Sequence, residues 1–226
     1  MDSVFDILGP IMIGPSSSHT AGAVNIGRVA GQVFGGDIST IELTLYGSFA
    51  ATYRGHGTDR ALVAGVMGMT PHNPLVKDAL RMAEERKIKV KIILEGESPY
   101  HPNTVKMVLS NGDAKSKIVG TSLGGGRIAV REIDSFKVNI TGSYNVLLCS
   151  YKEQVGMVAG VSRVLAANKI NIAFMTVSRN VERSEALMIL ETDEGLDQKT
   201  LGDIKSIDGM DVVRYIPQIS DEGGHA

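Results

Sequence analysis

The first group of chemically active side chains lies near the start of the chain. Three serines, Ser16, Ser17 and Ser18, are followed by His19 and Thr20, and then by apolar residues at helical spacing. The unpaired N–H groups of a helix N-terminus favour a carboxylate or a phosphate, hydroxyls add donors, and an imidazole can move a proton. Alternatively, one hydroxyl is only an N-cap and the others lie in a solvated loop. Three hydroxyls exceed what one cap requires, so we predict an anion-binding site.

A second histidine lies in a glycine-rich stretch further along the chain. His56 has a glycine on either side, and Thr58 and Asp59 follow. Because glycine leaves the backbone bare, a ligand or another chain can approach closely, and we predict an open loop over 46–59. A flexible loop with an incidental histidine explains this pattern equally well. Thr58 or Asp59 is the expected N-cap of an apolar helix over 60–68.

A third candidate group lies in a loop that contains two prolines. His101 stands close to Asn103 and Thr104, and the prolines make this loop rigid. Beyond it, the run Ser122–Gly126 contains three glycines and is similar in composition to a phosphate-binding loop. No Lys-Ser or Lys-Thr pair follows, so a bulge or a loop of close approach is the better interpretation.

The composition excludes several classes of function. The chain has 226 residues, 43% of them hydrophobic, which is enough for two domains with their own cores. Its 23 basic and 25 acidic residues leave a net charge of −2, so nucleic acid and anionic membranes are not expected partners. The start of the chain lacks a secretory signal pattern, and no apolar run approaches the roughly 20 residues that span a bilayer. We therefore expect a soluble, cytoplasmic protein.

The cysteine count bears on cofactors. Cys149 is the only cysteine and lies within an apolar run, which favours a buried thiol. A single cysteine excludes an intramolecular disulfide and cannot by itself hold an iron–sulfur cluster. The sequence therefore predicts that this chain binds no metal alone.

The residue patterns of the first part mix helices and strands. Apolar residues alternate over 41–45 and again over 90–94, as in strands with one buried face. A helix that begins at Pro74 lies between them. An Asn-Gly pair then predicts a hairpin whose first strand is 105–110. These elements predict an α+β domain, which we place at 1–140.

The last third of the chain has a different order of elements. Its patterns read strand, helix, strand, strand, helix, strand, the βαββαβ order of a ferredoxin-like fold. We place this domain at 145–217. The polar, glycine-rich residues 218–226 are expected to form a flexible tail.

The ferredoxin-like segment resembles an ACT domain, a regulatory module that binds amino acids. The resemblance rests on the turn after the first strand, on the end of the first helix, and on the start of the second strand. It implies that two copies associate side by side, with a small amino acid held between the first loop and the partner chain. The effector-binding residues that it implies are Gln154, Val155, Gly156, Asn171 and Ile172.

The whole chain resembles the β subunit of the iron–sulfur-dependent L-serine dehydratases. The stretches Gly14–Gly22, Gly55–Asp59, His101–Thr104 and Ser122–Gly126 occur in the order that this family shows. The resemblance implies loss of water from L-serine, giving pyruvate and ammonia, with a [4Fe-4S] cluster. In the two-chain form of the family a separate α subunit carries the cluster cysteines. The N-terminal domain is also similar to the allosteric substrate-binding domain of some phosphoglycerate dehydrogenases.

This resemblance implies roles for the residues singled out above. His56 is the expected base for the α-proton, with His19 in reserve, and the isolated chain is expected to be inactive without the α subunit. The alternatives are a non-catalytic, amino-acid-sensing regulatory protein and an adaptor that only scaffolds the α subunit. The expected substrate-binding residues are Ser16, Ser17, Ser18, Thr20, Thr58, Asp59, His101, Asn103 and Thr104.

Overall fold

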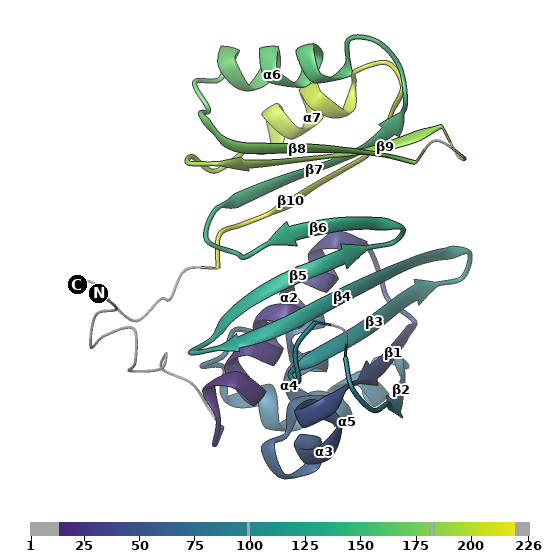
Figure 1. Ribbon diagram of the computed structural model, residues 1–226, viewed down its shortest axis with the longest axis vertical. Helices are drawn as coiled ribbons and strands as arrows, with labels where there is room; N and C mark the ends of the chain where they lie inside the picture. Colours follow the sequence, from purple (N-terminus) through teal and green to yellow (C-terminus); the bar gives the residue numbers. More distant parts are fainter. Residues whose placement is uncertain (1–13, 99, 181, 183, 220–226) are drawn as a thin grey trace, which may run out of the picture. The chain divides into compact units, whose positions relative to one another are not determined.

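The computed structural model describes residues 14–98, 100–180, 182 and 184–219, which form two compact units (Figure 1). Among the described residues, the first unit contains those up to 134 together with 138–141. The second contains 135–137 and 142–219. Each unit has its own sheet, and the two sheets share no strand. The mixed α+β prediction is confirmed.

The first unit is built on a six-stranded sheet in the order β2-β1-β3-β4-β5-β6. β1 and β2 are parallel, whereas β1–β3, β3–β4 and β4–β5 are antiparallel. The predicted Asn-Gly hairpin joins β3 to β4. The bounds are β1 Thr40–Leu45, β2 Lys89–Leu94, β3 Thr104–Asn111, β4 Ala114–Gly124, β5 Arg127–Ile133 and β6 Phe136–Ile140.

Helices cover this sheet in two steps. α2 packs against β3, β4 and β5, and α4 packs in turn against α2 (Figure 1). Gly35, in a left-handed conformation that glycine adopts readily, ends α2. Pro74 is the first residue of a 3-10 turn over Pro74–Asp78, capped by Asn73. The helices are α2 Gly22–Phe34, α3 Gly47–His56, α4 Thr58–Val66 and α5 Ala79–Glu85, with a π-helical turn over Ser17–Ala21 before α2.

Glycines let the backbones of α2 and α4 touch. A Cβ built on Gly27 would stand 2.2 Å from the carbonyl oxygen of Leu62, and one on Gly65 would stand 2.0 Å from that of Val24. Real side chains do not approach backbone so closely, so only glycine fits at either position. The contact fixes the position of α4 against α2. It therefore also fixes the positions of the residues at the N-terminal end of each helix.

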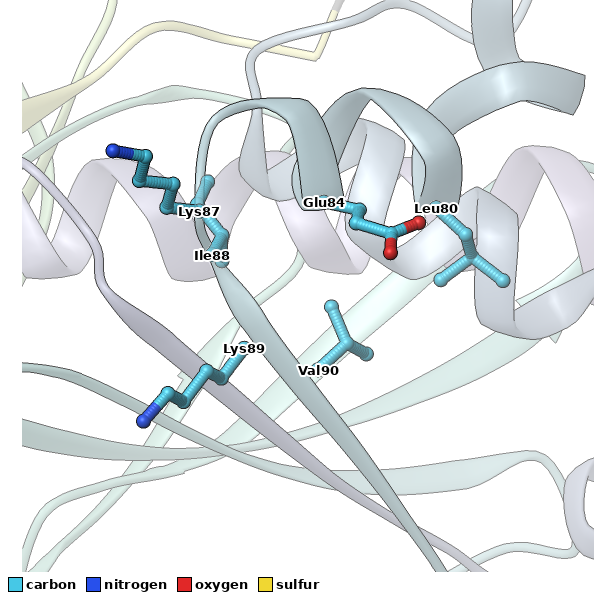
Figure 2. A pocket seen from close by; sticks show the side chains of 6 residues that line it. All are labelled: Leu80, Glu84, Lys87, Ile88, Lys89 and Val90. Atoms are coloured by element: carbon cyan, nitrogen blue, oxygen red, sulfur yellow. The ribbon is translucent and has the colours of Figure 1, made fainter.

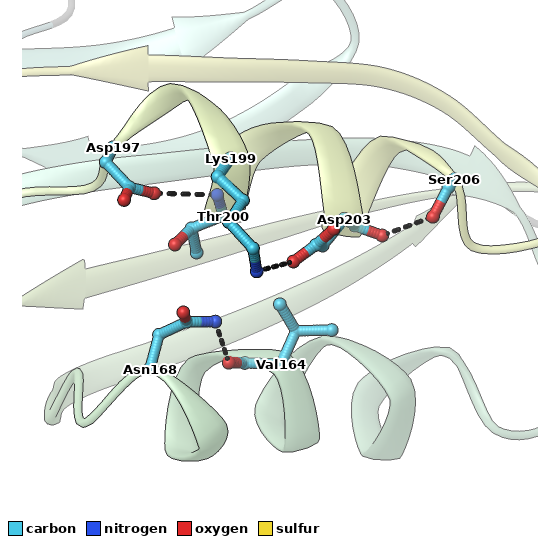
Figure 3. Close-up of polar contacts among 7 residues, drawn as sticks. All are labelled: Val164, Asn168, Asp197, Lys199, Thr200, Asp203 and Ser206. Carbon is cyan, nitrogen blue, oxygen red and sulfur yellow. Dashed lines mark hydrogen bonds and ion pairs between the residues drawn. The ribbon is translucent and has the colours of Figure 1, made fainter.

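The second unit has the predicted βαββαβ order, with its sheet arranged β10-β7-β9-β8. Both helices lie on one face of this sheet (Figure 1) and bury a core with the strands. Figure 3 shows how α7 is held: Asp197 accepts a 2.7 Å hydrogen bond from the Thr200 N–H at its N-terminus, and Lys199 pairs with Asp203. The bounds are β7 Asn145–Lys152, α6 Met157–Ala167, β8 Ile172–Asn180, β9 Glu185–Thr192, α7 Gln198–Lys205 and β10 Met210–Ile216.

The predicted tail over 218–226 lies only partly within the described residues. The backbone N–H of Gln218 donates to Oδ1 of Asn145, and that of Ile219 donates to the carbonyl oxygen of Gly142. Residues 220–226 lie outside the described residues.

The loop predicted over 46–59 is wrong. Gly47–His56 forms α3, and α4 begins at Thr58 with Gly57 as its N-cap, so neither Thr58 nor Asp59 caps it. Phe49 is the only buried residue of α3, so the sequence shows no stripe of apolar residues at helical spacing here. α3 contacts α4, the π-helical turn and β3.

Candidate functional site

His19 occupies the centre of a hydroxyl cluster in the π-helical turn before α2. Ser16 is the N-cap of this turn, and its Oγ accepts a 3.2 Å hydrogen bond from the His19 backbone N–H. The ring Nδ1 lies 2.9 Å from Oγ of Ser18 and 3.3 Å from Oγ of Ser16. The ring Nε2 lies 3.0 Å from Oγ of Ser48. Hydroxyls can donate or accept, so they satisfy both nitrogens of a neutral imidazole.

His56 stands beside His19 at the C-terminal end of α3. The two ring centroids are 4.7 Å apart with an interplanar angle of 36°. The Thr20 hydroxyl donates to the His56 carbonyl oxygen at 3.3 Å, which ties the α3 end to the π-helical turn. Nδ1 of His56 is buried and has no hydrogen-bond partner within the described part of the chain. The structure therefore brings together the two histidines that the sequence singled out separately.

The surroundings of His19 keep its ring neutral. Burial lowers the pKa of His19 below its ordinary value of 6.5, and the neighbouring His56 lowers it further, while a hydrogen bond from the ring to the Ser48 backbone acts in the opposite direction. The side chain is only 9% exposed, so the desolvation is substantial. A ring held neutral near pH 7 can accept a proton.

Ser48 and Phe49 are site residues that the sequence analysis missed. Ser48 bonds to the ring of His19, and the fully buried Phe49 meets that ring edge-on with centroids 5.3 Å apart. Both belong to the first turn of α3, the segment predicted to be a loop. If this segment had been predicted as a helix, Ser48 and Phe49 would have been expected beside the predicted histidines.

The third predicted motif joins this site through the start of α3. Gly47 has a positive φ of 48°, and a Cβ there would stand 2.8 Å from the carbonyl oxygen of Pro102. The Phe49 N–H donates to that same carbonyl oxygen. The loop over 101–104 therefore packs directly on the α3 turn that carries Ser48.

The members of the loop over 101–104 have different surroundings. The fully buried Thr104 hydroxyl donates to the His101 carbonyl oxygen at 2.7 Å and lies 3.0 Å from the Thr121 hydroxyl. Nδ1 of His101 accepts from the Asn103 N–H. Oδ1 of Asn103, in contrast, is buried without a partner. Thr104 thus holds the loop in place, whereas Asn103 keeps an oxygen for a further contact.

Unpartnered polar atoms gather in this part of the first unit. Buried polar groups in proteins are nearly always hydrogen-bonded, so each such atom points to a missing partner. Ser122 is one of them, and its hydroxyl lies where a Cβ on Gly22 would be, at the start of α2. Within the described residues of this unit the atoms are Oδ1 of Asn25, Nδ1 of His56, Oγ1 of Thr58, Oδ1 of Asn103 and Oγ of Ser122.

A pocket of about 130 Å³ opens next to His56. It is bounded by the Gly-His-Gly turn between α3 and α4, by the segment before the π-helical turn, and by the 3-10 turn. Of the predicted substrate-binding residues, Thr20 lines it, whereas Thr58 and Asp59, at the start of α4, do not. The lining residues are Gly14, Pro15, Thr20, Gly55, His56, Gly57, Arg60, Val76 and Lys77.

A larger surface depression lies elsewhere on the first unit. Its volume is about 450 Å³. Figure 2 shows its lining residues at α5 and the edge strand β2. None of the predicted site residues lines it. Its lining is Leu80, Glu84, Lys87, Ile88, Lys89 and Val90.

The described residues of this chain do not fit an iron–sulfur cluster. Among them, no three His, Cys, Asp or Glu side chains are grouped as metal ligands. The single cysteine, Cys149, is buried in β7 of the second unit, where desolvation raises the pKa of its thiol to about 12. A cluster needs several thiolates together, so this chain does not supply its ligands.

The predicted effector residues of the second unit fall into two groups. Gln154 follows β7 and donates to the Asp208 carbonyl oxygen at 2.7 Å, Val155 is fully exposed, and Gly156 has a left-handed backbone. Ile172 begins β8 and Asn171 directly precedes it, and the Asn171 side-chain amide donates to Asp193 at 2.6 Å. The register of β7, β9 and β8 places the two groups at opposite ends of the sheet. One chain alone does not bring them together.

Comparisons with known proteins agree with these features. The serine dehydratase beta chain family matches residues 3–133, and the ACT domain family matches residues 145–209. A probable L-serine dehydratase beta chain of Bacillus subtilis is 40% identical, covering 91% of this chain and 93% of that one. The L-serine dehydratase beta chain of Peptoniphilus asaccharolyticus is 34% identical, covering 95% and 97%.

A more distant similarity concerns a different enzyme. D-3-phosphoglycerate dehydrogenase of Synechocystis is 23% identical over 83% of this chain, but over only 34% of that protein. Within the described residues, no helix is both long and apolar enough to cross a membrane. The matches to beta chains cover nearly the full length on both sides, so the chain belongs to the family of serine dehydratase beta chains.

Proposed function

We propose that this chain is the β subunit of an L-serine dehydratase and that it acts with a separate α chain in the cytoplasm. The reaction removes water from L-serine, and the resulting aminoacrylate hydrolyses to pyruvate and ammonia. The single observation that carries the proposal is the pair of imidazoles, His19 and His56, 4.7 Å apart in a family member whose relatives bear this name. The family match favours this function over the regulatory alternative.

His56 is the base in this proposal. Elimination needs a neutral group that accepts the α-proton of serine, and Nδ1 of His56 is buried with no partner within the described chain. His19 has hydroxyls at both ring nitrogens, so neither nitrogen is open to substrate. Its ring lies beside His56, and the hydroxyls around it fix its orientation.

The remaining polar residues bind and orient the substrate. Asn103 offers an unpartnered carbonyl oxygen, which accepts a hydrogen bond from an ammonium group. Ser16 and Ser18 orient the His19 ring, and Thr104 fixes the loop that carries Asn103. Residues that lie in the same region and complete the proposed binding set are Ser17, Thr20, Thr58, Asp59 and His101.

The cofactor in this proposal belongs to the α chain. The described residues here do not fit a [4Fe-4S] cluster, so its cysteine ligands come from the partner. The buried polar atoms without partners, such as Oγ of Ser122, support the presence of a second chain or a ligand over this region. The isolated β chain is therefore inactive.

The second unit associates with a copy of itself and binds a small amino acid in this proposal. Its edge strand β8 exposes Phe174, Met175 and Val177, which suits pairing with another strand. Two β8 strands paired antiparallel bring Gln154 of one chain toward Asn171 of its copy. That arrangement unites the two groups that a single chain keeps apart.

An assay of pyruvate formation tests the function. The chain is combined anaerobically with an iron–sulfur α chain, and pyruvate formed from L-serine is measured with and without either chain. Turnover is expected only with both present. His56→Ala should abolish turnover while the two chains still co-elute in gel filtration. His72→Ala, which removes an exposed histidine of the same unit, is the matched control and should retain activity.

Two outcomes would contradict the proposal. No pyruvate from the wild-type pair would overturn the function itself. Near-normal turnover by His56→Ala would leave the function standing but overturn His56 as the base.

A further inference from the structure

The pocket beside His56 carries two cationic side chains that the proposed function has not used. Arg60 lies in the first turn of α4, and Lys77 lies in the 3-10 turn that follows Asn73. The Arg60 guanidinium lies along the Gly-His-Gly turn at the pocket wall, because a Cβ built on Gly57 would be in ordinary contact with Nε of Arg60, at 3.4 Å.

The charge of this pocket is uncompensated within the described chain. Six ion pairs join described residues, and none of them includes Arg60 or Lys77. Among the described residues, no carboxylate lines the pocket. The nearest one in sequence, on Asp59, accepts a hydrogen bond from the Arg60 backbone N–H rather than from its guanidinium. Two cations facing a concave pocket without a counter-ion select for an anion.

From this geometry we infer that the Arg60–Lys77 pocket binds a small carboxylate, which is that of the amino-acid substrate. The inference rests on the proposed function for the identity of the substrate. A volume of about 130 Å³ suits the carboxylate end of a small amino acid and is too small for a nucleotide. The guanidinium matches a carboxylate with two parallel N–H donors, and the lysine adds a point charge.

The position of His56 gives this binding site a catalytic consequence. The α-carbon of an amino acid is bonded directly to its carboxylate, so a carboxylate in this pocket places the α-proton at the pocket wall, which His56 forms. Removal of that proton moves negative charge onto the carboxylate oxygens. Cations fixed around those oxygens stabilise this charge as it develops.

The serine loop has a different role from the predicted one. Ser16 and Ser18 were predicted to grip an anion, but their hydroxyls contact each other and Nδ1 of His19. Orienting the imidazole accounts for both side chains. The carboxylate contact then passes to Arg60 and Lys77, which line the pocket beside His56.

The first test uses the full-length β chain alone. The Nε–Hε signal of Arg60 is followed by NMR during titration with L-serine, with L-serinamide, which has no carboxylate, and with inorganic phosphate. Arg60→Gln identifies the signal, and Arg54→Gln, which removes an exposed arginine outside the pocket, is the matched control. L-serine is expected to shift the signal in the wild type and in Arg54→Gln, and L-serinamide is not. Equal shifts with both compounds, no shift with L-serine, or a shift with phosphate alone would overturn the inference.

The second test uses the complex with the α chain. Arg60→Gln and Lys77→Gln should each raise KM for L-serine by roughly tenfold or more, as expected for loss of a charge-assisted contact. Arg54→Gln should leave KM unchanged. An unchanged KM in Arg60→Gln, with normal turnover in the wild type, overturns the pocket but not the proposed function. A wild-type complex without turnover overturns the function, and the titration of the isolated chain still decides whether the pocket binds a carboxylate.

Discussion

The replacement Gly65→Ala tests whether the contact between α2 and α4 positions the site. Gly65 faces the backbone of α2, and a Cβ there would lie 2.0 Å from the Val24 carbonyl oxygen and 2.8 Å from the Arg28 N–H. Both obstacles are backbone atoms, so no side chain can turn away to make room. Reaching an ordinary contact of 3.4 Å requires the helices to separate by about 1.4 Å.

Two effects of opposite sign decide the stability of this variant. Alanine is favoured over glycine inside a helix by about 1 kcal/mol. Overpacking of a tight interior contact costs about 1–3 kcal/mol, and a clash with backbone on both sides lies at the upper end of that range. We therefore expect Gly65→Ala to lower the free energy of unfolding of the first unit by about 2 kcal/mol.

Gly55→Ala is the matched control because it isolates the helix propensity. Gly55 is an exposed helical residue of α3 with nothing within 4 Å of a built Cβ. The same replacement there should stabilise the unit by about 0.5–1 kcal/mol. Both variants thus replace a helical glycine by alanine, but the expected changes in the free energy of unfolding have opposite signs.

Urea denaturation of the full-length chain, followed by far-UV circular dichroism, measures the change. Cys149 provides a separate reporter, since its thiol becomes reactive only when the second unit unfolds. A displacement of about 1 Å at a catalytic site costs about 10²-fold in rate, so turnover with the α chain should fall similarly in Gly65→Ala. A Gly65→Ala variant at least as stable as the wild type would refute the argument.

Three further predictions concern single groups. Because the pKa of His19 is lowered in the folded state, the unfolded chain binds the proton first as pH falls below 6.5. Stability should therefore decrease with falling pH in that window, and His19→Gln should flatten the dependence of the midpoint temperature on pH; an equal slope in both proteins would contradict the shift. The Cys149 thiol, whose pKa is raised to about 12, should resist alkylation at pH 8 in the native chain and react once urea unfolds it, and rapid native labelling would contradict its burial. Phe174→Glu, which charges the exposed edge strand β8, should shift the chain toward monomer in sedimentation velocity, whereas an unchanged oligomer would exclude this edge as the interface.

The sequence predicts the fold wherever the local pattern and the tertiary environment agree. The strand at 41–45 and the hairpin around Asn111 and Gly112 were predicted because an alternating pattern and a turn dipeptide describe a half-buried strand and its reversal directly. The βαββαβ order of the last third was predicted for the same reason. In these segments the neighbouring residues in the sequence are enough to indicate the conformation.

α3 could not be predicted because its causes lie outside its sequence. α3 contains two glycines near its ends and is followed by a third, Gly57, and of its residues only Phe49 is fully buried. Its start is held by Pro102, more than 40 positions away in the sequence, and its end by the left-handed Gly57. Neither contact leaves a periodic signal, so the glycine content was interpreted as a loop.

Contacts between segments that are distant in the sequence also explain which parts of the site could be predicted. His19 and His56 were found because two histidines in glycine- or serine-rich surroundings are unusual on their own. Their contact was not predictable, since it depends on α3 turning His56 back toward the π-helical turn. Ser48 was missed because a serine has chemical meaning only beside the imidazole that it orients, and that neighbour lies 29 residues away in the sequence. Arg60 was missed for a related reason. A lone arginine in a helix is ordinary in the sequence, and only the fold brings it together with Gly57 and Lys77 in one pocket.

The unpartnered atoms then suggest why these motifs lie so far apart in the chain. A site complete within one chain would satisfy its buried polar groups, because an unsatisfied one costs about 1–3 kcal/mol. Here Asn103 and Ser122, which come from different strand ends, each keep a buried oxygen without a partner in the described chain. In the proposed complex, a ligand or the α chain supplies the partners that these oxygens lack in the described chain. Under that proposal, binding of the partner is favoured by the groups that the fold leaves unsatisfied, and assembly completes the site.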